Sequence, residues 1–253
     1  MSVDEMLENH IHESWNDLFN NTMKEKLEEI FQKLEEKYGN LPNPPYQPTG
    51  KAIFNVFTMN ISKIKVVILG QDPYPTEGYA MGYAFAVPEG KEMQKSLKNI
   101  EEVIKKKVIK KESDLANHLE PEWKTLKYWI EGGVFLLNTA LTVEKNNAGS
   151  SFHLKLWEEF TKEVIKYIIS KKHPYLCIWM LWGKDKKKGA QRFEEDIKKY
   201  IKDIEEISTK DGKNYILKAP HPAVPNNSFR ECGYKNFLDA NEILLGEKEI
   251  IKW

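Results

Sequence analysis

Hydrophobic residues in this chain gather in four short runs, and each run is followed by a polar loop and then by a stretch with helical periodicity. A short apolar run bounded by turn-forming residues is typical of a β-strand that is buried on both faces. The four runs are Lys65–Leu69, Val134–Leu137, Leu176–Trp182 and Tyr215–Leu217. The helical stretches that follow them are Gln94–Lys107, Leu154–Ser170, Lys186–Ile201 and Tyr234–Leu245.

This alternation of buried strands and helices predicts an α/β fold with a central four-stranded parallel sheet flanked by helices. Residues 1–45 precede the first strand and form an N-terminal segment that is helix-like from Val3 to Tyr38, with a proline-rich connection after it. The sequence contains neither a flexible linker nor a repeat of fixed period. We therefore expect residues 1–253 to form a single domain.

Composition limits the function classes only weakly. The 253 residues are 41% hydrophobic, which is enough for one sizeable core. The 38 basic residues are balanced by 38 acidic ones, so any DNA-binding surface must arise from local segregation of charge. The lysine-rich pieces around Lys105 and Lys186 are most simply interpreted as solvated helix faces.

Two further features concern compartment and cofactors. Cys177 and Cys232 belong to no paired motif, so by themselves they cannot ligate an iron–sulfur cluster or a structural zinc. The N-terminus lacks the basic and apolar segments of a signal peptide, and no apolar stretch approaches the ~20 residues that span a membrane. We expect a soluble protein without a membrane partner, cytoplasmic, or nuclear in a eukaryote.

Polar residues stand where each predicted strand ends. They are Gln71-Asp72-Pro73-Tyr74, Asn138, Gly183-Lys184 and Pro220-His221-Pro222. Ligands of open parallel sheets bind beyond the carboxyl ends of the strands, so these groups would line one crevice. Taken alone, the pattern supports a hydrolase or a ligand-binding protein. Two of the residues also have a purely structural interpretation, because Asp72 before Pro73 could initiate a turn and Asn138 could be an ordinary loop residue. His221 is harder to explain that way, because prolines fix the backbone on both sides of it.

The segment VVILGQDPYP, continuing to GYAMGYAFAV, resembles the water-activating motif of family 1 uracil-DNA glycosylases. GVFLLNTALTV resembles the strand of that family that ends in a uracil-reading asparagine, and WEEFT, WMLWG and KAPHP follow in the family's order. The likeness runs from about Glu13 to the C-terminus. It implies a monofunctional DNA glycosylase that flips uracil out of DNA and hydrolyses its bond to deoxyribose. The resulting abasic site initiates base-excision repair, and no metal, redox cofactor or nucleotide is required.

The resemblance also implies a role for individual residues. Asp72, as an ionised carboxylate, would orient the attacking water and stabilise the sugar cation. His221 would donate a hydrogen bond to uracil O2, where negative charge collects as the base departs. Asn138 would read the polar edge of uracil and reject cytosine, whose donors and acceptors are reversed. Gln71 would support uracil binding chiefly through its backbone.

Two aromatic residues complete the implied pocket. Phe85 would cover one face of the base, and Tyr74 would occupy the space that a thymine methyl group needs. Ordinary core packing is the alternative interpretation of both rings.

The match is weakest in the segments implied to contact DNA. Pro75 stands where the family usually has a histidine, and PEGKEMQK stands where it has a proline-rich loop before Ser96. Ser150-Ser151-Phe152-His153 stands where the family has a Ser-His pair. HPAVPNNSFR stands where the family usually has HPSPLS, whose leucine enters the minor groove, so Val224 or Pro225 lies near that position. The residues expected at DNA are Ser96, Gly183, Lys184, Pro222, Val224, Pro225, Asn226 and Arg230.

The implied partner is uracil-containing DNA, single- or double-stranded, and DNA-mimicking inhibitor proteins are candidate partners. A relative acting on mismatched or thymine-derived bases is disfavoured by Tyr74 and Asn138, and the iron–sulfur branch by the two cysteines. A non-catalytic DNA-binding subunit is a further alternative. Retention of Asp72, Asn138 and His221 speaks against lost chemistry but leaves an additional binding role open.

Overall fold

A four-stranded parallel sheet forms the centre of the computed structural model, which describes residues 1–109, 121–173, 175–205, 213–225, 228–247 and 249–253. The strands are β2 (Val66–Gly70), β3 (Val134–Asn138), β5 (Cys177–Trp182) and β6 (Asn214–Ala219), in the order β3-β2-β5-β6. Each neighbouring pair is parallel. The predicted fold class is therefore confirmed, and each strand begins and ends within two residues of the run that predicted it.

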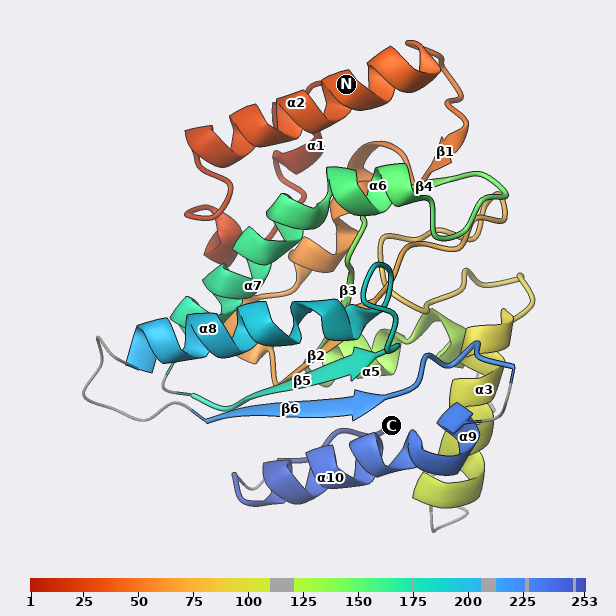
Figure 1. Ribbon diagram of the computed structural model, residues 1–253, viewed down its shortest axis with the longest axis vertical. Coiled ribbons are helices and arrows are strands. Elements are labelled where there is room, and N and C mark those ends of the chain that lie inside the picture. The colour runs from red at the N-terminus through yellow and green to blue at the C-terminus, as the bar shows by residue number, and fades with distance from the viewer. Residues whose placement is uncertain (110–120, 174, 206–212, 226–227, 248) are drawn as a thin grey trace.

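Apolar side chains on both faces of the sheet explain why the strands are recognisable as runs in the sequence. β2, β3 and β5 are buried throughout, whereas the edge strand β6 is mostly half-exposed. On one face the core includes residues of α2 (Asn21–Tyr38), α7 (Glu158–Lys172) and α8 (Glu194–Glu205). On the other face it includes residues of α3 (Lys95–Val103), α5 (Lys127–Glu131) and α10 (Tyr234–Leu245). Figure 1 shows α2, α7 and α8 above the sheet and α10 below it.

The remaining elements are short. They are α1 (Val3–Leu7), η1 (Glu13–Trp15), β1 (Tyr46–Gln47), η2 (Gly50–Thr58), η3 (Ile61–Lys63), the π turn η4 (Ile104–Val108), η5 (Pro121–Thr125), β4 (Val143–Glu144), α6 (Ser151–Leu156), η6 (Ala190–Phe193) and α9 (Ser228–Cys232). β1 and β4 pair in a separate antiparallel ribbon. In the part of the chain that the structure describes, no helix is long and apolar enough to cross a membrane.

Three of the predicted helices differ from the observed ones. The N-terminal segment is not one helix, because α2 has its own N-cap at Asn20, whose side chain accepts the N–H of Met23. The stretch Leu154–Ser170 is divided into α6 and α7 at Trp157, a buried residue whose indole N–H donates to the Thr142 hydroxyl.

The third difference lies next to the carboxyl edge of the sheet. Residues 186–188 form a turn instead of the first turn of a helix, and α8 begins only at Glu194. The Asp185 carboxylate accepts the N–H groups of Lys187 and Lys188, at 2.7 and 2.9 Å. These are the hydrogen bonds of a helix N-cap, but the turn that they begin ends at Gly189, whose backbone is extended with φ of −70° and ψ of 152°. The lysines around Lys186 are exposed to solvent as predicted, but they belong to a loop, so the prediction that they lie on a helix is wrong.

Candidate active site

The carboxyl ends of all four strands bring the predicted groups to one edge of the sheet. In Figure 1 this is the edge toward which the arrows of β5 and β6 point. β2 leads into Gln71 and Asp72, while Asn138 is the last residue of β3 and lies in register with Gly70. β5 leads into Gly183, and β6 leads through Ala219 to His221. The central position of β2 and β5 explains why loops from distant parts of the chain meet here.

Asp72 is held by two donors. Its Oδ2 accepts the N–H of Gly149 at 2.5 Å, and its Oδ1 accepts the side-chain amide of Gln71 at 3.1 Å. Burial raises the pKa of Asp72 above its ordinary value, while these two hydrogen bonds and the positive charge of Lys188 act to lower it. The donors therefore favour the ionised carboxylate in a site that otherwise penalises charge.

His221 is neutral, and its geometry fixes the position of its proton. Its Nδ1 accepts the N–H of Ala223 at 3.1 Å, and burial lowers its pKa to about 4. A neutral imidazole whose Nδ1 is an acceptor carries its proton on Nε2. His221 thus presents an Nε2–H donor, and its ring lies 6.0 Å from that of Phe85.

Asn138 has a buried side chain, only 5% exposed, that makes no hydrogen bond to any described residue. Gly70 leaves room for it: a β-carbon at position 70 would overlap Asn138 Oδ1 and lie 2.8 Å from the Ala84 β-carbon. The amide atoms of Asn138 are not among the described side-chain atoms that are fully buried without a partner, so they open on the site. Such a group is suited to pairing with a ligand that supplies the missing donors and acceptors.

Tyr74 and Phe85 are coupled through the backbone. The Tyr74 hydroxyl donates to the carbonyl of Phe85 at 2.9 Å, and Phe85 adopts a left-handed conformation with φ of 66°. A left-handed aromatic residue is rare and indicates a functional constraint. The Phe85 ring also contacts the core residue Trp182, with centroids 5.4 Å apart, so Phe85 packs on the core as well as beside His221.

The residues expected at DNA lie in different settings. Lys184, Val224 and Pro225 line a cavity of about 610 Å³ together with Gln71 and His221, and Gly183 lies in its wall with φ of 103°. Lys184 and Pro225 are exposed and Val224 is half-buried. Asn226 lies outside the described residues.

Three other predicted DNA contacts are tied into the protein. Ser96 is buried in the first turn of α3, and the buried Pro222 offers its carbonyl to the Asn99 amide. Arg230 donates to Asn99 Oδ1 and pairs with Glu102 at 2.8 Å. The Arg230 guanidinium is therefore already engaged along α3.

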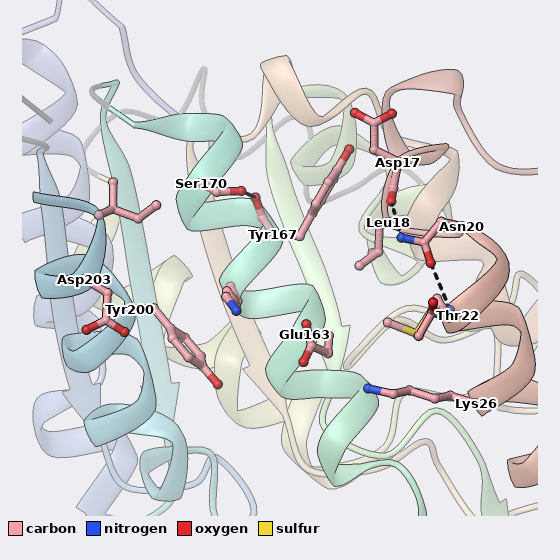
Figure 2. Close-up of a pocket in the computed structure, with 13 residues that line it drawn as sticks. Asp17, Leu18, Asn20, Thr22, Lys26, Glu163, Tyr167, Ser170, Tyr200 and Asp203 are labelled. Atoms are coloured by element: carbon pink, nitrogen blue, oxygen red, sulfur yellow. Dashed lines mark hydrogen bonds between the residues drawn. The ribbon is translucent and has the colours of Figure 1, made fainter. Parts of the chain in front are cut away.

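A second large cavity, of about 670 Å³, lies between α2, α7 and α8 (Figure 2). Tyr167 and Ser170 from α7 lie in its middle, with Lys26 on α2 and Tyr200 on α8 at its sides. It contains none of the predicted site residues. We therefore place the candidate site at the strand ends.

A family model described as "Uracil DNA glycosylase superfamily" matches residues 57–245, which include all four strands. A uracil-DNA glycosylase of Fusobacterium nucleatum is 37% identical, covering 91% of this chain and 94% of its own length. One of Pseudoalteromonas translucida is 36% identical, covering 81% of this chain and 83% of its own length. The chain belongs to the uracil DNA glycosylase superfamily.

Solved structures agree with this assignment to the uracil DNA glycosylase superfamily. The crystal structure of mimivirus uracil-DNA glycosylase is 25% identical with a TM-score of 0.70, covering all of this chain and 93% of its own. A Y322L variant of the mimivirus protein in complex with UGI is 27% identical with a TM-score of 0.69, covering 95% of this chain and 87% of its own. The resemblance to uracil-DNA glycosylases noted in the sequence is thus confirmed.

Some residues that build the site cannot be recognised in the sequence. The buried Gln47 donates from its side chain to the carbonyls of Tyr74 and Thr76, at 2.7 and 2.6 Å, and so fixes the loop after β2. Gly149 donates to Asp72 across 77 positions of sequence. Neither residue stands in a recognisable motif, so only the fold could identify it. Lys188 belongs to a lysine run, which in the sequence resembles a solvated helix face.

Proposed function

We propose that this protein excises uracil from DNA by hydrolysing the N-glycosidic bond to deoxyribose, as a monofunctional uracil-DNA glycosylase that initiates base-excision repair. The observation that carries the proposal is the meeting of three groups at one sheet edge. They are a carboxylate held by two donors, a neutral imidazole with its Nε2–H available, and an amide that makes no hydrogen bond to any described residue. In a flipped deoxyuridine the carboxylate matches the sugar, the imidazole matches the departing base, and the amide matches the polar edge of uracil.

Asp72 and His221 divide the chemistry between them. As the bond from C1′ to uracil N1 breaks, positive charge develops on the sugar and negative charge on uracil O2. The Asp72 carboxylate orients the water whose oxygen adds to C1′ and accepts the proton that this water loses, and its negative charge stabilises the sugar cation. The Nε2–H of His221 donates to O2, and a donor aimed at developing charge is worth about 2.7–4 kcal/mol.

Four residues select the base. The amide NH2 of Asn138 pairs with uracil O4 and its carbonyl with N3–H, an arrangement that cytosine cannot match. Phe85 stacks on one face of the base, and the Tyr74 ring fills the space of a 5-methyl group. Gln71 contributes its backbone to uracil binding, while its side chain already supports Asp72.

DNA contacts are proposed at the rim of the 610 Å³ cavity. The exposed ammonium of Lys184 meets a phosphate as a point charge, beside the backbone of Gly183. Val224 and Pro225 enter the space vacated by the flipped base, supported by Pro222. Asn226 is proposed as a DNA contact from its sequence position alone. Ser96 is buried in α3 and does not line this cavity, and Arg230 anchors the loop through Asn99 and Glu102.

A protein inhibitor that mimics DNA is a proposed second partner. The support is the likeness to the mimivirus variant whose structure contains UGI. An inhibitor of this kind would cover the same rim that receives DNA. It would therefore compete with uracil-containing DNA rather than act at a distance.

The decisive experiment uses an end-labelled single-stranded oligonucleotide with one uracil. Incubation with the protein followed by hot alkali should cut the strand at that position, whereas omission of alkali should leave it intact. Matched oligonucleotides with thymine or cytosine and the Asp72→Asn variant serve as controls. Cutting without alkali would indicate lyase activity, and an intact strand after alkali would refute the proposed function.

A further inference from the structure

The loop between β5 and η6 carries a cluster of positive charge at the edge of the site. It contains Lys184, Lys186, Lys187 and Lys188 around a single acidic residue, Asp185. The Asp185 carboxylate caps the turn by accepting two backbone N–H groups, and Gly189 packs tightly against the backbone of Gly183. The backbone that carries these lysines is thus held in a defined conformation.

Lys188 is the member of this cluster that lies beside Gly149, the residue that donates to the Asp72 carboxylate. A β-carbon at Gly149 would lie 3.5 Å from both Cδ and Nζ of Lys188, and Gly149 itself donates to Asp72. The ammonium group forms no hydrogen bond or ion pair with any described residue. Its charge acts on two carboxylates and lowers the pKa of both Asp185 and Asp72.

The other groups around Asp72 are neutral or more remote. His221, from the loop after β6, is uncharged at neutral pH, and burial raises the pKa of Tyr74, so its hydroxyl also stays neutral. Gln71 and Gly149 contribute dipoles only. Lys184 and Asp185 lie at the cavity rim with opposite charges. Among the described residues, Lys188 is the one whose full charge acts on the Asp72 carboxylate.

We propose that Lys188 is a positioning residue for the glycosylase reaction, whose ammonium group beside Gly149 keeps the Asp72 carboxylate ionised and oriented. The inference rests on the proposed function of Asp72. Burial disfavours the charged carboxylate, and a nearby cation offsets that penalty without touching the substrate. Lys188 thus extends the range of pH over which Asp72 is active toward the acidic side.

The test is the pH profile of kcat/KM on a single-stranded uracil oligonucleotide, because this ratio reports ionisations of the free enzyme. Lys188→Gln should move the acidic limb of this profile, where activity falls as Asp72 is protonated, to higher pH by roughly half a unit to one unit. This shift is smaller than the ~1–3 units of a close buried pair because Lys188 is exposed. Lys188→Arg keeps the positive charge and should return the limb to its wild-type pH. Lys186→Gln removes the same charge from the same turn and should leave the limb in place.

A measurement on the unchanged protein supplies a second test. Raising the ionic strength from about 0.05 M to about 0.5 M should move the wild-type limb in the same direction, and should move the limb of Lys188→Gln less. A limb that stays in place in Lys188→Gln, or moves equally in Lys186→Gln, would overturn the inference. So would a uniform fall in kcat/KM at every pH, which indicates a phosphate contact. Absence of uracil release by the wild-type protein would instead refute the proposed function itself.

Discussion

Replacing Tyr74 by phenylalanine separates two roles that one side chain combines. The ring, proposed to exclude thymine, is retained, but the hydroxyl that donates to the Phe85 carbonyl at 2.9 Å is lost. Phe85 is held at φ of 66°, a conformation that costs an ordinary residue about 1–2 kcal/mol. The hydrogen bond from Tyr74 helps to offset this cost, so its removal should loosen the ring that stacks on uracil.

The expected loss of activity follows from the free energy of this hydrogen bond. Phe85 is only 8% exposed, and leaving its carbonyl without the Tyr74 donor costs about 1–3 kcal/mol. Some of this is recovered when Phe85 relaxes, so we expect a net loss of about 1–2 kcal/mol. At about 1.4 kcal/mol per factor of ten, kcat/KM for uracil should fall roughly 5- to 30-fold. Thymine should still be rejected, because the ring remains in place.

The assay compares Tyr74→Phe in the wild-type background and in a Phe85→Ala background. If the hydroxyl acts through Phe85, the loss should be much smaller once the stacking ring is absent, as a double-mutant cycle reveals. Tyr74→Ala is the matched control for selectivity and should permit weak thymine excision. An equal loss in both backgrounds, or unchanged activity of Tyr74→Phe, would refute the coupling.

Other substitutions test the packing, the pH dependence and the wedge. Gly70→Ala should displace Asn138, because the new β-carbon would overlap Oδ1, and should lower kcat/KM at least tenfold; native activity would refute the packing argument. Burial lowers the pKa of the fully buried His153 from 6.5 to about 4, so its neutral form stabilises the fold above pH 6.5 and this contribution is lost as pH falls toward 4. At about 1.4 kcal/mol per pKa unit this contribution is at most about 3.5 kcal/mol, and urea midpoints should fall less steeply with acid in His153→Gln. Pro225→Leu should improve uracil release from duplex but not from single-stranded DNA, since a larger wedge offsets unstacking; equal gains on both would place the wedge elsewhere.

The sequence by itself determined the sheet and most of the proposed chemistry. Strands buried on both faces must be apolar throughout, so four runs were enough to predict four parallel strands. Parallel strands end at one edge, so the positions of Asp72, Asn138 and His221 along the chain were enough to assign them to one crevice. The domain boundaries and the roles of these residues remain predictions.

Tertiary structure decided how these groups are held. The N–H of Gly149 at Asp72, the acceptor role of His221 Nδ1 and the left-handed backbone of Phe85 depend on contacts between loops, which local periodicity does not encode. For the same reason Lys188 lies in a loop beside the site instead of on a long helix, because the turn that Asp185 caps ends at Gly189, which is extended and packs against the backbone of Gly183.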